Sequence, residues 1–319
     1  MSLNSITGMS HISEVVEETN QRLYRFKTGQ LKPLKTFSKK LDNAIGGFYP
    51  GDQITIAARP GVGKSAFVNV LVDAIENNNK DAKTVILYFS LEMANYSQVI
   101  RLYSKETGIT SKQLQSAWEP LPEDSWNNVL KMSDRLKNRN IFFRDHKVTR
   151  YSWRKTMEEA FEKFPGHQLV SIVDHTRLIT KMGGEKSEEE KITEFMADAV
   201  EFKNQTDSIN IFLSQLNRNI ESASGADREA VGKSAPRLTD IFGSDSVGQF
   251  STLVLGLHRP EKYLVNPFVY AGETYDTRNF LPVFLLKQRD GEEGMIPLYH
   301  DLTHYRIADT LEELNLTQF

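Results

Sequence analysis

The sequence predicts an α/β fold in which helices cover both faces of a mostly parallel β-sheet that ends in an antiparallel edge. Short apolar runs with strand character alternate along the chain with longer segments whose apolar residues recur at helical spacing. The last two strands have little helix between them, which favours an antiparallel pair. The expected strands are 53–57, 84–90, 140–144, 169–174, 210–214, 252–257, 281–287 and 295–299. The expected helices are 66–76, 98–107, 123–137, 153–164 and 189–206.

An N-terminal segment, residues 1–40, is expected to precede this domain, which would span 41–319. Residues 10–27 predict an amphipathic linker helix that needs a partner surface. Its apolar stripe consists of Ile12, Val15, Val16, Leu23 and Phe26. The polar, lysine-rich stretch after it contains Gly29 and Pro33, which interrupt regular structure, so residues 27–40 are predicted to form a linker.

The composition excludes several classes of function. The 319 residues contain no cysteine, which removes disulfides, thiolate nucleophiles and Cys-ligated zinc or iron–sulfur sites. The formal net charge is -3, so any nucleic-acid contact must come from a local basic surface. The amino terminus lacks an apolar core, and the longest apolar run, 85–89, is too short to cross a bilayer. We therefore expect a globular cytoplasmic protein without a membrane partner.

A glycine-rich segment between the first expected strand and helix has the pattern of a phosphate-binding P-loop. It consists of Ala58, Arg59, Pro60, Gly61, Val62, Gly63, Lys64, Ser65 and Ala66. Backbone N–H groups at such a turn form a concave, partly positive surface that suits the β- and γ-phosphates of a nucleotide. Lys64 is expected to reach the β- and γ-phosphates, and the Ser65 hydroxyl to hold Mg²⁺. Ala58 stands where the general pattern has Gly, but the flanking strand and helix favour a P-loop over a ligand-free turn.

Two carboxylates follow expected strands at the sheet edge where open α/β sheets bind ligands. Asp174 ends an apolar strand and is the expected Mg²⁺ carboxylate; the alternative is a cap on the next helix. Glu92 follows the strand 84–90, where it would activate water as a general base. Its alternative role is that of a first-turn glutamate favoured by the helix dipole.

Three further polar residues are candidates for sensing or completing ATP cleavage. Gln215 follows the strand 210–214, where its amide either senses a γ-phosphate or is merely a polar strand end. Lys287 and Arg289 are two residues apart, so on a strand both point to one side. Such a pair suits the polyphosphate of a neighbouring subunit, where an arginine raises turnover by about 10³ to 10⁵. The alternative is a solvated strand end before an Asp-Gly turn.

Two segments without apolar periodicity, 182–188 and 219–236, are expected to be loops. Cations on or beside them are candidates to neutralise a nucleic-acid backbone, although each also fits a solvated surface charge. These candidates are Lys181, Lys186, Arg228, Lys233 and Arg237.

Taken in order, these motifs resemble the C-terminal motor domain of the DnaB family of replicative DNA helicases. The resemblance covers residues 41–307, nearly the whole chain, and Ala in place of the first P-loop Gly is familiar in that family. After the P-loop, the similar segments are 89–93, 172–174, 213–218, 238–240, 258–260 and 287–291. Several motifs in the same order are more specific than any one of them.

The resemblance implies a RecA-like ATPase core assembled as a hexameric ring, with ATP between subunits and single-stranded DNA in the central channel. By position it makes Asp174 the Walker B acid and Ser65 its partner on Mg²⁺. The implied catalytic residues are Lys64, Glu92 as base, Gln215 as sensor, and Lys287 and Arg289 acting in trans. The helix at residues 10–27 resembles the linker helix of the family, which docks on the next subunit.

The chain also departs from the family pattern. The N-terminal domain of the family has no counterpart, so primase contact through it is not expected, and a helicase of a phage or mobile element is favoured. His175 stands where the family usually has Tyr. The segment 241–250 lacks the Arg-Glu pair of the matching DNA-binding loop, so we expect Phe242, beside Gly243, to contact DNA by stacking.

Two other functions are built on similar motifs. One is a RecA- or KaiC-like ATPase that binds DNA or protein without unwinding, and the other is a nucleotide-switched loader whose ATPase is only regulatory. The expected partners are single-stranded DNA, further copies of this chain, and a helicase loader or other replisome protein.

Overall fold

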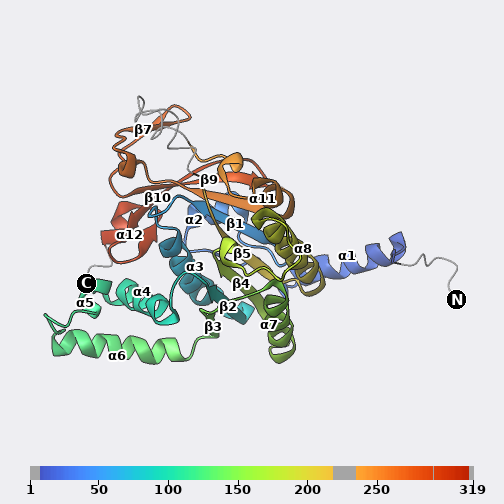
Figure 1. The fold of residues 1–319 in the computed structure, drawn as a ribbon, viewed down its shortest axis with the longest axis horizontal. Helices are drawn as coiled ribbons and strands as arrows, with labels where there is room; N and C mark the ends of the chain where they lie inside the picture. Colours follow the sequence, from blue (N-terminus) through green and yellow to red (C-terminus); the bar gives the residue numbers. More distant parts are fainter. Residues whose placement is uncertain (1–7, 218–234, 290, 316–319) are drawn as a thin grey trace.

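The strands form a nine-stranded sheet and a separate two-stranded hairpin in the part of the chain that the structure describes (Figure 1). The computed structural model describes residues 8–217, 235–289 and 291–315. The strand order is β11-β10-β9-β6-β1-β5-β4-β2-β3, and the first three of these run antiparallel to their neighbours. The predicted fold class is confirmed, including the antiparallel C-terminal edge.

All eight predicted strands are present, with ends within a residue or two of the prediction. The six parallel strands are β1 (Gln53–Ala58), β2 (Thr84–Ser90), β3 (Ile141–Arg144), β4 (Gln168–Asp174), β5 (Ile209–Gln215) and β6 (Leu253–Leu257). The antiparallel strands are β9 (Phe280–Gln288), β10 (Gly294–Asp301) and β11 (Arg306–Ala308). Strands β1 and β2 are buried along their whole length, because helices cover both faces.

The sheet separates two hydrophobic cores. Helices α2 (Lys39–Ile45) and α3 (Lys64–Asn78) pack on one face, where Phe67 and Leu71 meet Ile54. The other face is covered by α7 (Arg150–Lys163), α8 (Glu188–Thr206) and α11 (Ser244–Phe250). There the rings of Trp153 and Phe195 lie 5.3 Å apart in an edge-to-face contact, which fixes α7 against α8.

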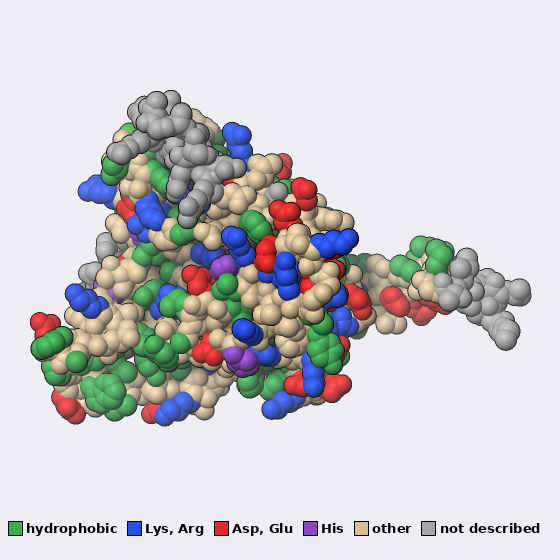
Figure 2. All heavy atoms as spheres, viewed as in Figure 1, with side chains coloured by type: hydrophobic (Ala, Val, Ile, Leu, Met, Phe, Trp, Pro, Cys, Tyr) green, Lys and Arg blue, Asp and Glu red, His purple; other side chains and the backbone are tan. Residues whose placement is uncertain are grey.

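Three helices lie beyond the parallel edge of the sheet, next to α3. They are α4 (Asn95–Thr107), α5 (Ser111–Leu114) and α6 (Glu123–Lys137), and α6 has the predicted bounds. Val129 and Met132 are the buried residues of α6. Trp118, Trp126 and Leu130 stay exposed, and Figure 2 shows hydrophobic side chains gathered over α5 and α6.

Helix α1 (Ile12–Lys27) projects away from the body of the molecule (Figure 1). Only its C-terminal end is attached: Arg22 pairs with Asp207 and donates to the carbonyl of Pro50 at 2.8 Å. The Phe26 ring lies 6.2 Å from that of Tyr49. The rest of the predicted stripe is exposed, so the helix has no partner for it within the described part of this chain.

The predicted linker at residues 27–40 is packed against the domain. Leu31 and Leu34 are buried, and Leu34 pairs with Phe48 in an isolated β-bridge. The Ser38 hydroxyl bonds to Asp309, which also accepts the backbone N–H of Lys39 at 2.8 Å. Residues 31–40 therefore already pack against the domain. The predicted domain boundary at residue 41 stays a prediction.

A buried ion-pair network ties α3 to the helices beside it. The Asp73 carboxylate accepts from Lys105 of α4 and from Arg139, each at 2.5 Å, and Arg139 also lies 3.4 Å from Glu76. Burial raises the pKa of Asp73, but the two cations outweigh it and hold the pKa below its usual value of 3.8. The network therefore stabilises the fold above that pH and is lost as Asp73 becomes protonated.

We expect Asp73→Asn to lower the free energy of unfolding by about 3 kcal/mol, because it leaves two partly buried cations without their carboxylate. Urea unfolding at neutral pH measures the loss, and the difference from wild type should shrink as the pH falls below about 4. Asp134→Asn is the matched control, since the Asp134–Lys137 pair is exposed and its removal should cost less than about 0.5 kcal/mol. Equal effects in the two variants would contradict a structural role for the network.

No helix among residues 8–217, 235–289 and 291–315 is long and apolar enough to cross a membrane. The expected cytoplasmic location stays a prediction.

Candidate nucleotide-binding site

The segment between β1 and α3 has the backbone conformation of a P-loop. Gly61 and Gly63 have φ values of +72° and +116°, a region that favours glycine, and α3 begins at Lys64. A Cβ on Gly63 would also lie 3.0 Å from the side chain of Leu302. The first N–H groups of α3 therefore open towards one small volume beside the loop, while the Val62 N–H donates to the Arg59 carbonyl at 3.2 Å and closes the turn.

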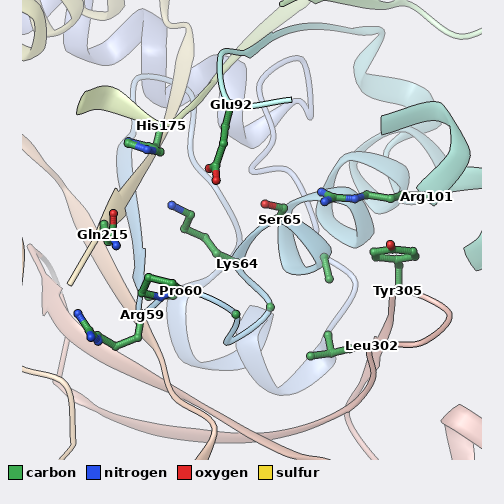
Figure 3. Close-up of a pocket in the computed structure, with 14 residues that line it drawn as sticks. Arg59, Pro60, Lys64, Ser65, Glu92, Arg101, His175, Gln215, Leu302 and Tyr305 are labelled. Carbon is green, nitrogen blue, oxygen red and sulfur yellow. The ribbon is translucent and has the colours of Figure 1, made fainter. Parts of the chain in front are cut away.

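That volume is a cavity of about 330 Å³ at the carboxyl edge of the parallel strands (Figure 3). Every predicted P-loop residue from Ala58 to Ala66 lines it except Val62, whose side chain is buried in the core. The Arg59 guanidinium donates to the carbonyl of Leu216 at 2.9 Å and so ties the loop to the end of β5. The residues of the predicted P-loop therefore line one cavity, and nucleotide binding there stays a prediction.

Lys64, Ser65 and Asp174 meet at the base of this cavity. The Lys64 Nζ lies 4.0 Å from Asp174 Oδ1 and 3.5 Å from the carbonyl of Ser214, and the Ser65 hydroxyl donates to Asp174 Oδ2 at 3.3 Å. Burial lowers the pKa of Lys64, although the carboxylates of Asp174 and Glu92 oppose this shift. Burial raises the pKa of Asp174, and Glu92 adds to the rise while Lys64 opposes it. A desolvated lysine and a desolvated carboxylate therefore face one another where phosphates would enter.

The donor set fits Mg²⁺. Asp174 is 1% exposed and its Oδ1 has no hydrogen-bond donor among the described residues, so one carboxylate oxygen is left for a cation. The Ser65 hydroxyl is a second hard oxygen ligand beside it. The described residues hold no cluster of three or more His, Cys, Asp or Glu side chains for a metal. Mg²⁺ in such a site keeps waters and substrate phosphates as its other ligands, and it neutralises charge on the phosphates when bound.

The two other predicted active-site residues also reach the cavity. Ser90 pairs with Asp174 across β2 and β4, so Glu92, two residues beyond the strand, emerges at the same edge. It lies before α4 rather than in the first turn of that helix. Gln215 pairs with Ala58 across β5 and β1 and stands on the opposite side of Lys64 from Ser65 (Figure 3). The sheet register thus brings together residues from three strand ends.

Four lining residues were not predicted. Arg101 of α4 points towards Ser65, donates to the sulfur of Met93 and lies with its guanidinium 5.4 Å from the Tyr305 ring (Figure 3). Tyr305 and Leu302 come from the turn between β10 and β11. His175 follows Asp174, and burial together with the charge of Lys64 lowers its pKa to about 4, so it is neutral at physiological pH.

Lys287 and Arg289 do not reach the cavity of their own chain. Lys287 pairs with Val254 near the start of β6, and the Arg289 N–H donates to the carbonyl of Thr252 at 3.0 Å. Because β6 is parallel to β1, this is the sheet edge opposite the P-loop. Arg289 is exposed and lines a second cavity beside Arg22 and Phe26 of α1. These cations therefore do not contact a nucleotide bound in the cavity of their own chain.

The predicted DNA contacts are only partly described. Arg228 and Lys233 lie outside the described residues. Lys186 and Arg237 are exposed, and Lys181 lies 3.4 Å from Glu188.

Phe242 and Gly243 do not line the cavity, but they are linked to it through Gln215. The N–H of Phe242 donates to the carbonyl of Gln215 at 3.2 Å, and Gly243 is the N-terminal cap of α11. The guanidinium of Arg177, which the sequence did not single out, lies 4.7 Å from the Phe242 ring. The Phe242 ring thus lies next to the predicted sensor, half-buried against the core and with a cation over one face.

Comparison with known proteins agrees with this geometry. The model of the DnaB-like helicase C terminal domain matches residues 33–309. The chain belongs to this family. Among DnaB-family relatives, the replicative DNA helicase DnaB of Geobacillus stearothermophilus is 25% identical over 295 residues, which are 91% of this chain and 60% of that protein. The DnaB of Helicobacter pylori J99 is 27% identical over 259 residues, or 80% of this chain and 50% of that protein. The chain thus spans about half of the length of these curated relatives.

Solved structures of the DnaB type have the same fold. The solved ATPase domain of a phage protein superposes with a TM-score of 0.79 at 21% identity, covering 95% of this chain and 99% of that domain. A DnaB-like replicative helicase, solved in a study of its interactions with primase, superposes with a TM-score of 0.76 at 20% identity, covering 94% of this chain and 67% of that one. The predicted RecA-like ATPase fold is confirmed by these likenesses.

Proposed function

We propose that this chain is the motor of a DNA helicase of the DnaB type, which hydrolyses ATP with Mg²⁺ and moves along single-stranded DNA. The observation that carries the proposal is the convergence of Lys64, Ser65, Glu92, Asp174 and Gln215 on one cavity above the P-loop. In this site Lys64 and the loop amides bind the triphosphate, and Asp174 and Ser65 hold the metal. Glu92 takes a proton from the attacking water.

The proposed assembly is a ring of several copies, six by analogy with the family, and the incomplete site supports it. Each copy holds a base and a phosphate cradle, but its Lys287 and Arg289 lie at the opposite edge of its sheet. The exposed stripe of α1 supplies a surface for contact with the next copy. In this arrangement Arg289 completes the ATP site of a neighbouring copy in trans.

Single-stranded DNA is the proposed polymer because the nucleotide sensor touches the predicted contact segment. The backbone carbonyl of Gln215 accepts the N–H of Phe242. A movement of Gln215 when the γ-phosphate binds or leaves would therefore pass directly to a residue whose ring can stack on a base. The proposed cations for the DNA backbone are the exposed Lys186 and Arg237, together with Lys181, which lies 3.4 Å from Glu188. A helicase loader or other replisome protein is a further partner in this proposal.

Lys64→Ala should reduce ATP turnover at least about a hundredfold, because it removes the cation that faces the phosphates. ATP hydrolysis is measured with and without single-stranded DNA, alongside unwinding of a forked duplex. Lys137→Ala, at an exposed position of α6, is the control and should behave as wild type. Undiminished turnover in Lys64→Ala would overturn the assignment of the site. DNA-stimulated turnover without unwinding would favour the RecA-like alternative, and turnover that ignores DNA would favour the regulatory loader.

A further inference from the structure

The segment that follows β6 donates hydrogen bonds to the P-loop from outside the nucleotide cavity. It comprises Arg259 and the short helix η4 (Pro260–Tyr263), part of a motif to which the proposed function gives no role. Arg259 Nη1 donates to the carbonyl of Gly61 at 3.2 Å, and Lys262 Nζ donates to the carbonyl of Pro60 at 2.6 Å. Neither side chain lines the cavity, whereas Pro60 and Gly61 both do. The two cations therefore hold the outer side of the loop.

These contacts fix the direction of the loop amides. The C=O and N–H of a trans peptide point in opposite directions, and the peptide between Pro60 and Gly61 is trans. With the Pro60 carbonyl held by Lys262, the Gly61 N–H points away from that cation, to the side of the loop that lines the cavity. Arg259 holds the carbonyl of the next peptide, between Gly61 and Val62, whose N–H donates to the Arg59 carbonyl at 3.2 Å and so closes the turn of the loop.

The peptides on either side of Gly61 are the part of the loop whose orientation depends most on these hydrogen bonds. Gly61 has no Cβ and adopts a left-handed φ of +72°, so its peptide planes turn with little steric resistance. A turn of the Pro60–Gly61 peptide would present a carbonyl oxygen, in place of an N–H, to an incoming phosphate. Lys262 also lies so close that a Cβ on Gly61 would be 2.6 Å from its Nζ. The lysine thus occupies the space directly over the loop.

The anchoring segment is itself fastened to the antiparallel half of the sheet. Glu261 lies 3.0 Å from Arg259 Nε and 3.3 Å from Nε2 of His300, a residue of β10. It also accepts the backbone N–H of Asn279 at 3.3 Å, and Pro260 is buried. The two cations therefore reach the P-loop from a support that does not depend on α3.

We propose that Lys262 and Arg259 are positioning residues: Lys262 holds the Pro60–Gly61 peptide with its amide directed at the phosphates of the bound nucleotide, and Arg259 holds the turn that follows it. The proposal rests on the proposed function, because it assumes that this cavity binds a nucleoside triphosphate. It predicts an effect on the loop before any nucleotide arrives, which separates it from a simple attraction between lysine and phosphate.

The test compares Lys262→Met with Lys262→Arg by hydrogen exchange of the nucleotide-free protein and by binding of a nonhydrolysable ATP analogue. In Lys262→Met we expect faster exchange in the peptide that spans residues 58–63, unchanged exchange in β5, and about tenfold weaker binding, equivalent to one lost hydrogen bond. Lys262→Arg keeps a donor for the Pro60 carbonyl and should restore both properties. Lys262 is exposed, so its replacement does not threaten the core, and Lys137→Met is the control.

Three results would overturn the inference. Wild-type exchange and wild-type affinity in Lys262→Met would show that the loop needs no outer anchor. Weaker binding without faster exchange would show that the lysine acts by charge alone. Faster exchange in β5 as well as in the loop would show general destabilisation. Lys64→Ala distinguishes the two proposals: if it abolishes turnover while Lys262→Met binds normally, the inference fails and the proposed function stands.

Discussion

Replacing Glu92 with Gln should lower ATP turnover at least about a hundredfold while nucleotide binding is kept. The amide has the size of the carboxylate but cannot accept the proton of an attacking water. Glu92 lines the cavity on the same side of the sheet as Asp174, and its charge adds to the raised pKa of that residue. Its removal therefore leaves the phosphate cradle intact, and the metal carboxylate becomes easier to ionise.

Steady-state hydrolysis and binding of a fluorescent ATP analogue, measured on the same preparation, check this expectation. Glu119→Gln is the matched control, because Glu119 is exposed and does not line the cavity. Turnover that survives in Glu92→Gln would assign the base to another residue. A parallel loss of binding would mean that Glu92 shapes the cradle and is not the base.

Arg289→Ala should lower turnover by about 10³ to 10⁵, as loss of an arginine supplied in trans does. The structure excludes action of Arg289 on the ATP site of its own chain, because it lies at the opposite edge of the sheet from Lys64. Mixing Arg289→Ala with Lys64→Ala should therefore restore part of the turnover. In a mixed assembly some sites combine an intact Lys64 with an intact Arg289 from the next copy.

The mixing experiment requires that neither variant turns over ATP alone. Arg278→Ala replaces an arginine whose side chain is 84% exposed, and it should leave turnover unchanged. If the two inactive variants stay inactive when mixed, although light scattering shows that they assemble together, Arg289 does not act in trans. Monomers under all conditions would contradict the shared site itself.

The central strands could be predicted from the sequence because they are long, apolar and buried on both faces. Strand β2 and helix α6 were predicted with their observed bounds, since their periodicity continues to each end. The hairpin of β7 (Phe268–Tyr270) and β8 (Glu273–Tyr275) was missed because three residues show no alternation. Helices α2 and α11 were missed because seven residues, about two turns, are too few to show a helical period.

The candidate site was predictable where it follows directly from sheet geometry. In a parallel sheet, residues after successive strands must meet at one edge, which places Glu92, Asp174 and Gln215 around the P-loop. Arg101 and Tyr305 reach the cavity from α4 and from the turn before β11, whose positions depend on packing that no local pattern encodes. Lys262 acts on the loop through a side-chain contact with Pro60, a residue about 200 positions earlier in the chain.

Lys287 and Arg289 are not equivalent targets for mutagenesis, although they stand two residues apart. The Lys287 ammonium donates to the carbonyls of Gly248 and Ser251, at 2.5 and 2.6 Å, and so fastens the end of β9 to the end of α11. A defect in a Lys287 variant would combine a loosened protomer with any missing charge at a neighbour. Arg289 is exposed, and its side chain fastens no such pair of elements among the described residues, which makes it the residue whose replacement reports on cooperation between copies alone.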